Sequence, residues 1–246
     1  MSMMFSGLFD QHGQHARSMV PDQLSGVWNA IVTANNDPDK LGRVKVKFPL
    51  REGELQTDWI RVATMMGGSS RGTLFIPEVN DEVLVAFLMG RIDSPIVIGS
   101  LWNKVDKPPA PHEKNDIRQI KTRSGHEITF QDTDNDGKIT IKTNKGHKIE
   151  LEEQSNSITV ETKDKAQSIV MTGGSSGTVT VKAGGTAKIV MSNQGDVTIE
   201  GTKSATIKGP KIEVDAQASL TLQSGGMLEM KANGMVSIKG SIVKIN

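Results

Sequence analysis

The stretch that decides the fold is VTIEGTKSATIKGPKIEVDAQASLTLQSGG, residues 197–226, where pairs of apolar residues separated by one residue recur about every eight positions. Alternation places both apolar side chains of a pair on one face of a short extended segment. Gly, Asn or Ser stands between many of the pairs, as is typical of chain corners. The pattern extends back to Ile139, at a spacing of about ten, and forward to Ile245. A fixed period of this kind predicts a β-solenoid.

The core of these repeats is purely aliphatic, because residues 131–246 contain no Trp, Tyr or Phe. Two medium-sized aliphatic side chains per repeat bury too little apolar area to offset the cost of ordering a single ribbon. One short strand per repeat also gives a single chain only one face, whereas three chains wound together would close three faces around a narrow core. We therefore predict that residues 125–246 form an intertwined, triple-stranded β-helix in a homotrimer.

The first half of the chain has a different composition and includes all three tryptophans. VWNAIVTAN (residues 27–35), RVKVKF (residues 43–48) and DWIRVA (residues 58–63) predict strands, and RVKVKF alternates strictly. Five or six strands in about 80 residues, without an amphipathic helix, predict a small closed barrel, with an OB-like fold among the options. We expect an N-terminal arm at 1–23, the barrel at 24–105 and a proline-containing linker at 106–124.

Overall composition excludes several classes of protein. Lys plus Arg number 29 and Asp plus Glu number 28, so global charge gives no reason to expect a polyanionic partner. The chain has no cysteine, which excludes disulfide scaffolds, thiolate metal sites and a cysteine nucleophile. The N-terminus lacks a basic segment followed by an apolar one, so we expect no signal peptide and synthesis in a cytoplasm.

Several motifs in order carry a family resemblance. DPDKLGRVKVKFP (residues 37–49), DWIRVA, FIPEVNDEVLVAFLMGRIDSPIVIGSLWNKVDKPP (residues 75–109) and SGHEITFQD (residues 124–132) resemble the spike proteins of contractile injection machines. These are the phage baseplate assembly protein V family and the VgrG spikes of type VI secretion. The resemblance implies a homotrimeric central spike with an OB-fold domain followed by a β-helix needle.

The resemblance also implies partners and a place of action. Hub or baseplate proteins would contact the OB domain and the N-terminal arm, and the needle would meet the target membrane transiently during piercing. The spike would assemble in the bacterial cytoplasm and become part of a virion or a secreted injection particle. Some relatives end in a metal-binding H-x-H tip, but the last histidine here is His147. A separate tip protein of the PAAR type is therefore expected to contact Ile245 and Asn246.

One segment has part of a calcium-loop pattern. DTDNDGKITIKT places Asp132, Asp134 and Asp136 at alternate positions, but Thr143 stands where the loop needs a bidentate glutamate. The flanking residues predict strands rather than helices, so an acidic β-turn is favoured over a weak calcium site. No arrangement of residues predicts a catalytic centre, a cofactor site or another metal site, and we expect a protein that is not an enzyme.

Two alternatives remain open. The predicted trimeric β-helix also resembles those of tail-spike enzymes that cleave surface polysaccharide. Such enzymes bind sugars on platforms of aromatic residues, which a needle without aromatics lacks. OB-folds often bind oligonucleotides, and Arg43, Lys45 and Lys47 share one strand face. No aromatic residues interleave with these charges, so a solvated or hub-facing strand is favoured, and we expect no nucleic-acid partner.

Overall fold

The computed structural model of the chain describes residues 26–49, 56–109 and 113–245. The expected N-terminal arm and Asn246 lie outside these ranges. The chain divides into two compact units, residues 1–144 and 145–246, which are considered separately here. The described residues are almost entirely strands and loops, with a single 3-10 turn, η1 (Leu88–Gly90). Within the described ranges, no helix has both the length and the hydropathy that crossing a bilayer requires.

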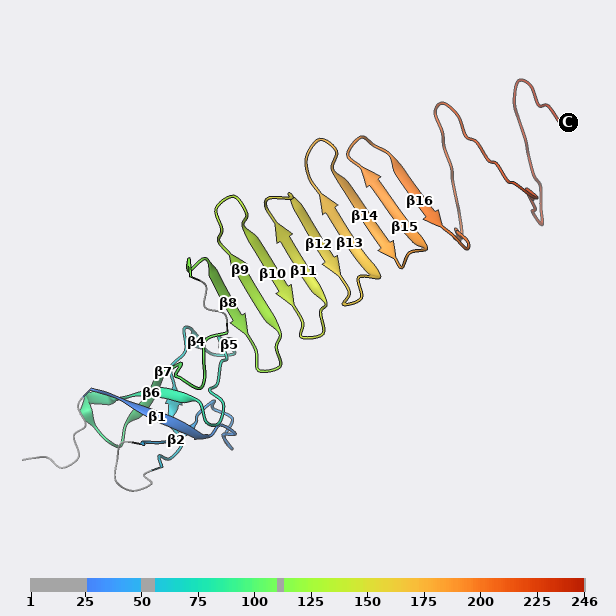
Figure 1. Cartoon of the computed structure of the whole chain (residues 1–246). Coiled ribbons are helices and arrows are strands. Elements are labelled where there is room, and N and C mark those ends of the chain that lie inside the picture. Colours follow the sequence, from blue (N-terminus) through green and yellow to red (C-terminus); the bar gives the residue numbers. More distant parts are fainter. Residues whose placement is uncertain (1–25, 50–55, 110–112, 246) are drawn as a thin grey trace, which may run out of the picture. The chain divides into compact units, whose positions relative to one another are not determined.

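The first unit begins with a strongly curled five-stranded sheet (Figure 1). Its strands follow the spatial order β2 (Lys45–Lys47), β1 (Val27–Ala34), β6 (Glu82–Phe87), β7 (Pro95–Ser100) and β3 (Arg61–Val62). β3 pairs with β7 in parallel and the other pairs are antiparallel. An isolated bridge between Val44 and Ile60 joins the two ends of the sheet and closes it into a barrel. A short hairpin, β4 (Gly67–Gly68) and β5 (Arg71–Gly72), lies in the glycine-rich segment MGGSSRG, residues 66–72.

The core of the barrel is made by the alternating residues of its strands. Val44, Val46 and Phe48 are buried on one face of the RVKVKF segment, as the alternation predicts. Across the sheet, Val32 pairs with Val46, and Val85 pairs with Val97. The full cluster consists of Ala30, Val32, Val44, Val46, Phe48, Ile60, Val83, Val85, Phe87 and Val97. TLFIP, residues 73–77, contains several apolar residues but forms no strand, because it has no ladder partner.

A buried carboxylate organises the turn between β1 and β2. Asp37 is only 6% exposed and accepts hydrogen bonds from the backbone N–H groups of Asp39 and Leu41 at 3.1 and 3.0 Å. Arg43 donates to the same carboxylate from Nε at 2.9 Å and from Nη2 at 2.7 Å. These bonds stabilise the charged form, and the Arg43 guanidinium holds the pKa of Asp37 far below its usual range. The turn therefore depends on an ionised aspartate.

The first unit ends in a three-stranded antiparallel meander. Its strands are β8 (Ile117–Lys121), β9 (Glu127–Gln131) and β10 (Lys138–Lys142). β8 lies inside the segment expected to be a linker, so regular structure begins earlier than the sequence suggested. IRQIK was overlooked because its isoleucines are three residues apart and do not alternate.

The second unit is a six-stranded antiparallel meander in which each strand pairs with the next along the chain (Figure 1). The strands are β11 (Lys148–Glu152), β12 (Ser157–Glu161), β13 (Gln167–Thr172), β14 (Thr178–Ala183), β15 (Ala187–Ser192) and β16 (Val197–Gly201). Each hairpin turn contains one residue with positive φ, the conformation that tight antiparallel turns require. These residues are Asn156, Lys165, Gly174, Gly184 and Gly195.

Beyond Gly201 the chain continues without strands. Residues 202–245 are extended legs broken by bends (Figure 1). The sequence repeat continues through this segment, but its apolar pairs have no ladder partner within the chain. A segment counts as a strand only when its backbone pairs with a neighbouring segment. Residues with the alternating pattern of strands can therefore form no strand in a single copy. The expected intertwining of three copies is not tested by one chain.

Candidate functional site: an apolar sheet face

The register of the second unit aligns the repeat into two rows on one face of the sheet. Cross-strand pairing sets Ile149 opposite Val160, and Val160 opposite Ile169. The first row is Ile149, Val160, Ile169, Val181, Ile189 and Ile199, and the second is Leu151, Ile158, Met171, Val179, Met191 and Val197. We call these twelve residues the apolar face. Each member lies next to its cross-strand partner, and contacts between such side chains stabilise a sheet.

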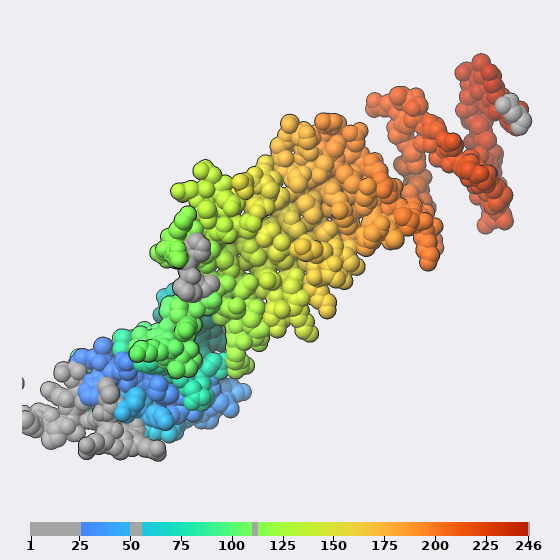
Figure 2. Space-filling view, in the orientation of Figure 1, coloured from blue at the N-terminus to red at the C-terminus, as the bar shows by residue number. Residues whose placement is uncertain are grey.

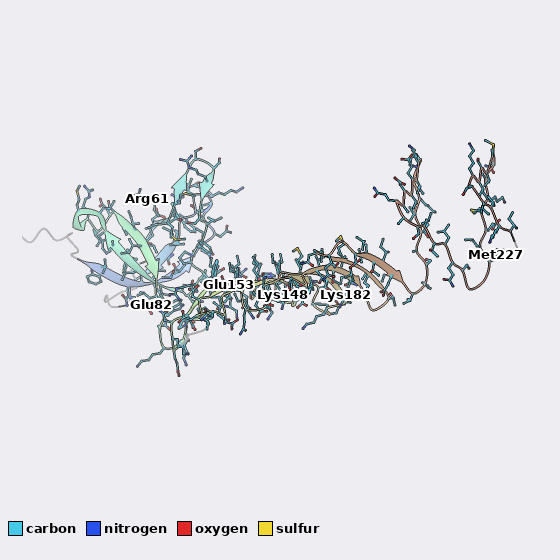
Figure 3. The ribbon with its side chains drawn as sticks, turned by 90° about the horizontal axis from the view of Figure 1, so that it is seen from above. Arg61, Glu82, Lys148, Glu153, Lys182 and Met227 are labelled. Carbon is cyan, nitrogen blue, oxygen red and sulfur yellow. The ribbon has the colours of Figure 1, made fainter. Side chains whose placement is uncertain are left out.

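The apolar face is uncovered in the single chain. Ile149 is 40% exposed although it lies in the middle of a regular strand, and Val197 and Ile199 at the end of the sheet are each 65% exposed. Figure 3 shows side chains projecting from both surfaces of the sheet. A contiguous apolar surface of this kind marks an interaction site in a soluble protein.

The opposite face carries the charged residues of the repeat. Lys148 Nζ lies 3.0 Å from Glu150 Oε1 and 3.3 Å from Glu161 Oε1. Both carboxylates raise the pKa of Lys148 above its ordinary value, and the hydrogen bond to Glu150 has the larger effect. Lys188 and Glu200 form a similar pair at 3.2 Å. These ion pairs distinguish this face from the apolar one.

The three-stranded meander of the first unit has the same two-faced character. Phe130 pairs with Ile139, and Ile128 pairs with Ile141, on one face of the sheet. All four side chains are between 36% and 43% exposed. Phe130 is the last aromatic residue of the chain and lies within the repeat rather than before it.

Of the two residues expected to contact a tip protein, only one lies in the described part of the chain. Ile245 is 91% exposed, whereas Asn246 lies outside the described residues. The expectation of a tip protein at this end therefore stays a prediction.

The three aspartates of the incomplete calcium motif lie in and beside the hairpin turn between β9 and β10. Asp132 is 3.8 Å from Arg118 Nη1, and the Asp136 N–H donates to the Thr133 carbonyl oxygen. In the described parts of the chain, no three carboxylate or histidine groups gather closely enough to hold a metal ion. The expectation that this segment is an acidic turn rather than a calcium site stays a prediction.

Calcium should therefore leave the protein unchanged. We expect the unfolding temperature, followed by circular dichroism, to be the same with millimolar calcium as with a chelator. The Asp134→Asn variant should behave identically in both buffers. A calcium-dependent rise in the wild type that Asp134→Asn abolishes would restore the calcium interpretation.

The barrel has a cavity of about 480 Å³ with an aromatic lining. Trp28, Trp59, Phe48 and Phe87 contribute to it, and the rings of Phe48 and Phe87 lie 5.8 Å apart, centroid to centroid. The lining also includes the carboxylates Asp58 and Asp93.

Neither carboxylate of this cavity is suited to act as a general acid. Hydrogen bonds from Arg91 lower the pKa of Asp93 to about 2. The Trp59 N–H, assisted by Lys45, lowers the pKa of Asp58. Both groups are ionised at neutral pH, whereas a general acid must carry a proton there.

Two of the three cations considered for nucleic-acid contact are engaged within the barrel, whereas Lys47 is exposed. Arg43 is bound to Asp37 and Asp39. Lys45 lies 5.2 Å from the centroid of the Trp59 ring and 3.5 Å from Asp58 Oδ1. A phosphate backbone would have to compete with these partners, so the geometry does not favour an oligonucleotide site.

Comparison with known proteins places the barrel in a family. Residues 28–102 match the type VI secretion system/phage-baseplate injector OB domain. The chain is 37% identical over 105 residues to the type VI secretion system spike protein VgrG2a of Pseudomonas aeruginosa, covering 39% of this chain and 12% of the relative. It is 32% identical over 131 residues to the spike protein VgrG3 of Vibrio cholerae, covering 48% of this chain and 13% of the relative.

A third relative is named as a toxin. The actin cross-linking toxin VgrG1 of Vibrio cholerae is 33% identical over 104 residues, which cover 38% of this chain and 10% of the toxin. The chain thus spans only a small part of the relatives it matches. The matching family model, the spike relatives and the closed five-stranded barrel all agree: residues 28–102 are similar to the OB domain of type VI secretion system and phage-baseplate injector proteins.

Proposed function

We propose that the protein is the central spike of a contractile injection apparatus. This class comprises phage tail baseplates, tailocins, extracellular injection particles and type VI secretion systems. The single observation that carries the proposal is the uncovered apolar face, which follows an injector-type OB domain in the same chain. The needle would be three copies of the repeat with their apolar faces turned inward.

Three copies suit this surface better than two. Each strand of the repeat offers only two inward side chains, so the sheet is narrow. Two narrow sheets packed face to face would leave water along both sides of the apolar layer. Three sheets close a triangular prism, and aliphatic side chains fit its narrow interior, whereas indole rings would not. The ion pairs of Lys148 and Lys188 would then line the outer surface.

The proposed mechanism is mechanical. When the sheath of the apparatus contracts, the spike is driven into the target envelope and must transmit force without unfolding. A prism of hydrogen-bonded strands would resist unfolding under this force, because removing one copy would expose the apolar layer along the whole rod. The OB domain and the N-terminal arm, residues 1–23, would dock on hub proteins, and a PAAR-type protein would cap Ile245 and Asn246.

No step of this mechanism requires a catalytic residue, metal or cofactor. We accordingly propose that the chain is not an enzyme. It would assemble in the bacterial cytoplasm and act as part of a virion or a secreted particle.

The mass in solution tests the proposal. We expect about three times the 26.6 kDa of the chain, roughly 80 kDa, by light scattering at micromolar concentration. The assembly should also resist SDS unless it is boiled, as kinetically stable β-structures do. A monomer or a dimer of the full chain would reject the trimeric spike, and release of sugars from bacterial polysaccharide would favour the tail-spike enzyme.

A further inference from the structure

The lysines of the six-stranded sheet gather at one of its edges. Alternate turns of an antiparallel meander lie at the same edge (Figure 1), and the space-filling view shows the two edges as margins of one continuous surface (Figure 2). The three turns at one edge, residues 153–156, 173–177 and 193–196, contain no lysine or arginine. The turns at the other edge are residues 162–166 and 184–186. Four lysines lie in these turns or within two residues of them: Lys163, Lys165, Lys182 and Lys188.

A hollow of about 820 Å³ lies at this edge. Three of the four lysines, Lys165, Lys182 and Lys188, contribute to its lining. Glu200 supplies the one carboxylate among the lining residues, so three positive charges and one negative charge give the lining a net charge of +2. Most of the remaining lining residues are glycine, alanine or threonine, whose small side chains leave room between the lysines.

Lys182, which is labelled in Figure 3, occupies a position that local electrostatics disfavours. The register of β14 and β15 sets it directly opposite Lys188. Like charges directly opposite each other destabilise a sheet. In the part of the chain that the structure describes, no carboxylate lies within ion-pair distance of Lys182 to relieve this repulsion. The sequence therefore keeps a cation at this position although the sheet would be more stable without it.

Lys165 is also unexpected at its position. Each hairpin of the second unit contains one residue with positive φ, and in four of the five it is Asn156, Gly174, Gly184 or Gly195. Asparagine and glycine tolerate this left-handed backbone, whereas a lysine there is strained. Lys165 nevertheless adopts a φ of 57°. Two lysines that local physics disfavours thus line the same hollow, and residues of that kind cluster at ligand sites.

The carboxylates near the hollow are already engaged. Glu200 pairs with Lys188 at 3.2 Å. Asp164, which precedes Lys165 in its turn, accepts hydrogen bonds from the Thr162 hydroxyl at 2.6 Å and the Ala166 N–H at 3.1 Å. The positive charges of Lys165 and Lys182 are therefore left to attract an anionic ligand.

The turn between β14 and β15 adds neutral donors to the hollow. The N–H groups of Gly185 and Thr186, which line it, form no backbone–backbone hydrogen bond within the described ranges. A Cβ at Gly185 would meet nothing within 4 Å, so the space beside the turn is open. Successive backbone N–H groups beside lysines are donors that suit the oxygens of a phosphoryl group.

We propose that this hollow binds the phosphoryl group of an anionic membrane lipid. Lys165 and Lys182 would contact the phosphoryl oxygens, and the N–H groups of Gly185 and Thr186 would complete the site. Lys182 follows Val181 of the apolar face and so stands on the opposite, charged face, which the proposed spike turns outward. The hollow would therefore stay accessible in the assembly.

A lipid suits the proposed spike better than a free anion does. A needle that crosses a bilayer passes the phosphoryl groups of its lipids, and three copies would present three hollows to one membrane. Several weak sites on one particle bind a surface far more tightly than they bind separate small ions. The anion site follows from the geometry of one copy, whereas the choice of a membrane lipid rests on the proposed piercing role.

Sedimentation of the full-length protein with lipid vesicles tests the inference. We expect vesicles of equal parts phosphatidylglycerol and phosphatidylcholine to bind the protein at least about tenfold more tightly than vesicles of phosphatidylcholine alone. Raising the salt concentration from about 0.1 M to about 0.5 M should weaken this binding, because salt screens exposed charges. Inorganic phosphate and a single-stranded oligonucleotide are titrated separately as the competing anions, and light scattering on the same sample reports the number of copies.

Two double variants give the matched control. Lys165→Gln combined with Lys182→Gln removes two charges from the hollow, and we expect its binding to the phosphatidylglycerol vesicles to be at least about tenfold weaker than that of the wild type. Its unfolding temperature should not fall, because the repulsion between Lys182 and Lys188 is gone. Lys145→Gln combined with Lys163→Gln removes two exposed lysines that do not line the hollow. Its binding should stay within about threefold of the wild type.

The outcomes separate this inference from the proposed spike. A trimeric wild type that does not bind the phosphatidylglycerol vesicles would overturn the inference and leave the spike standing. Equal weakening in both double variants would also overturn it, because it would indicate diffuse attraction rather than a site. Binding of inorganic phosphate or of the oligonucleotide without binding of vesicles would assign the hollow to another anion and reject the lipid. A monomer whose vesicle binding depends on Lys165 and Lys182 would support the lipid site and reject the trimeric spike.

Discussion

Val160→Lys should convert the proposed trimeric spike to separate copies. Val160 lies in the middle of the apolar face, between Ile149 and Ile169 on the flanking strands. In a closed prism the substitution would place three lysines in one layer of the core. Burying charges without partners costs several kcal/mol each, so we expect a loss of roughly 10 kcal/mol per assembly. Light scattering should give a mass near 26.6 kDa, or soluble aggregates, instead of three copies.

Thr159→Lys is the matched control, because Thr159 is the adjacent residue on the opposite face. This variant should remain trimeric. The tryptophans provide a second control: all three lie in or beside the OB domain and none lies in the repeat. Their fluorescence should report the same unfolding of the barrel in both variants, which distinguishes failed assembly from a failed fold. A trimeric Val160→Lys would mean that the apolar face does not point inward.

Asp37→Asn should produce the largest loss of stability in the barrel. The amide keeps the size of the side chain but removes the charge that Arg43 contacts with two nitrogens. It also weakens the acceptor of the Asp39 and Leu41 N–H groups. Replacing a bidentate ionic acceptor should lower the unfolding temperature by on the order of 10 °C, measured by tryptophan fluorescence. Asp39→Asn, which alters an exposed carboxylate, should have a much smaller effect.

The pH dependence of the stability difference between wild type and Asp37→Asn tests whether the charge of Asp37 is its cause. The folded pKa of Asp37 is lowered, so its contribution is complete above the unfolded value of about 4 and is lost as the pH falls towards the folded one. The gap in stability between wild type and Asp37→Asn should be constant from about pH 5 to 8 and should shrink below about pH 4. A gap that is unchanged in acid would show that the charge of Asp37 does not stabilise the turn.

Much of the fold follows from the alternation of apolar residues. Val44, Val46 and Phe48 are buried together because a strand sends every second side chain to one face. The same rule located the apolar pairs of the repeat. It failed at β8, where Ile117 and Ile120 do not alternate, and in residues 73–77, which have apolar residues but no ladder partner. Local pattern predicts the capacity to form a strand, whereas pairing requires a neighbour.

The candidate site was predictable in part. The apolar pairs and their inward direction can be read from the sequence, but the two aligned rows depend on a register that the hairpin turns determine. The importance of Asp37 does not follow from the sequence analysis, in which DPDKLG serves only as part of a family motif. An aspartate at the start of such a turn with an arginine six residues later is the signal that could have identified this buried ion pair.

The unpaired segment beyond Gly201 has a consequence for the cell that makes the protein. An unassembled copy exposes about forty residues with unpaired backbone groups and exposed aliphatic side chains. Such a segment is a substrate for chaperones and proteases. In the proposed trimeric spike this stretch would be covered and would escape degradation. We therefore expect surplus copies to be short-lived, so that the cell retains only finished needles.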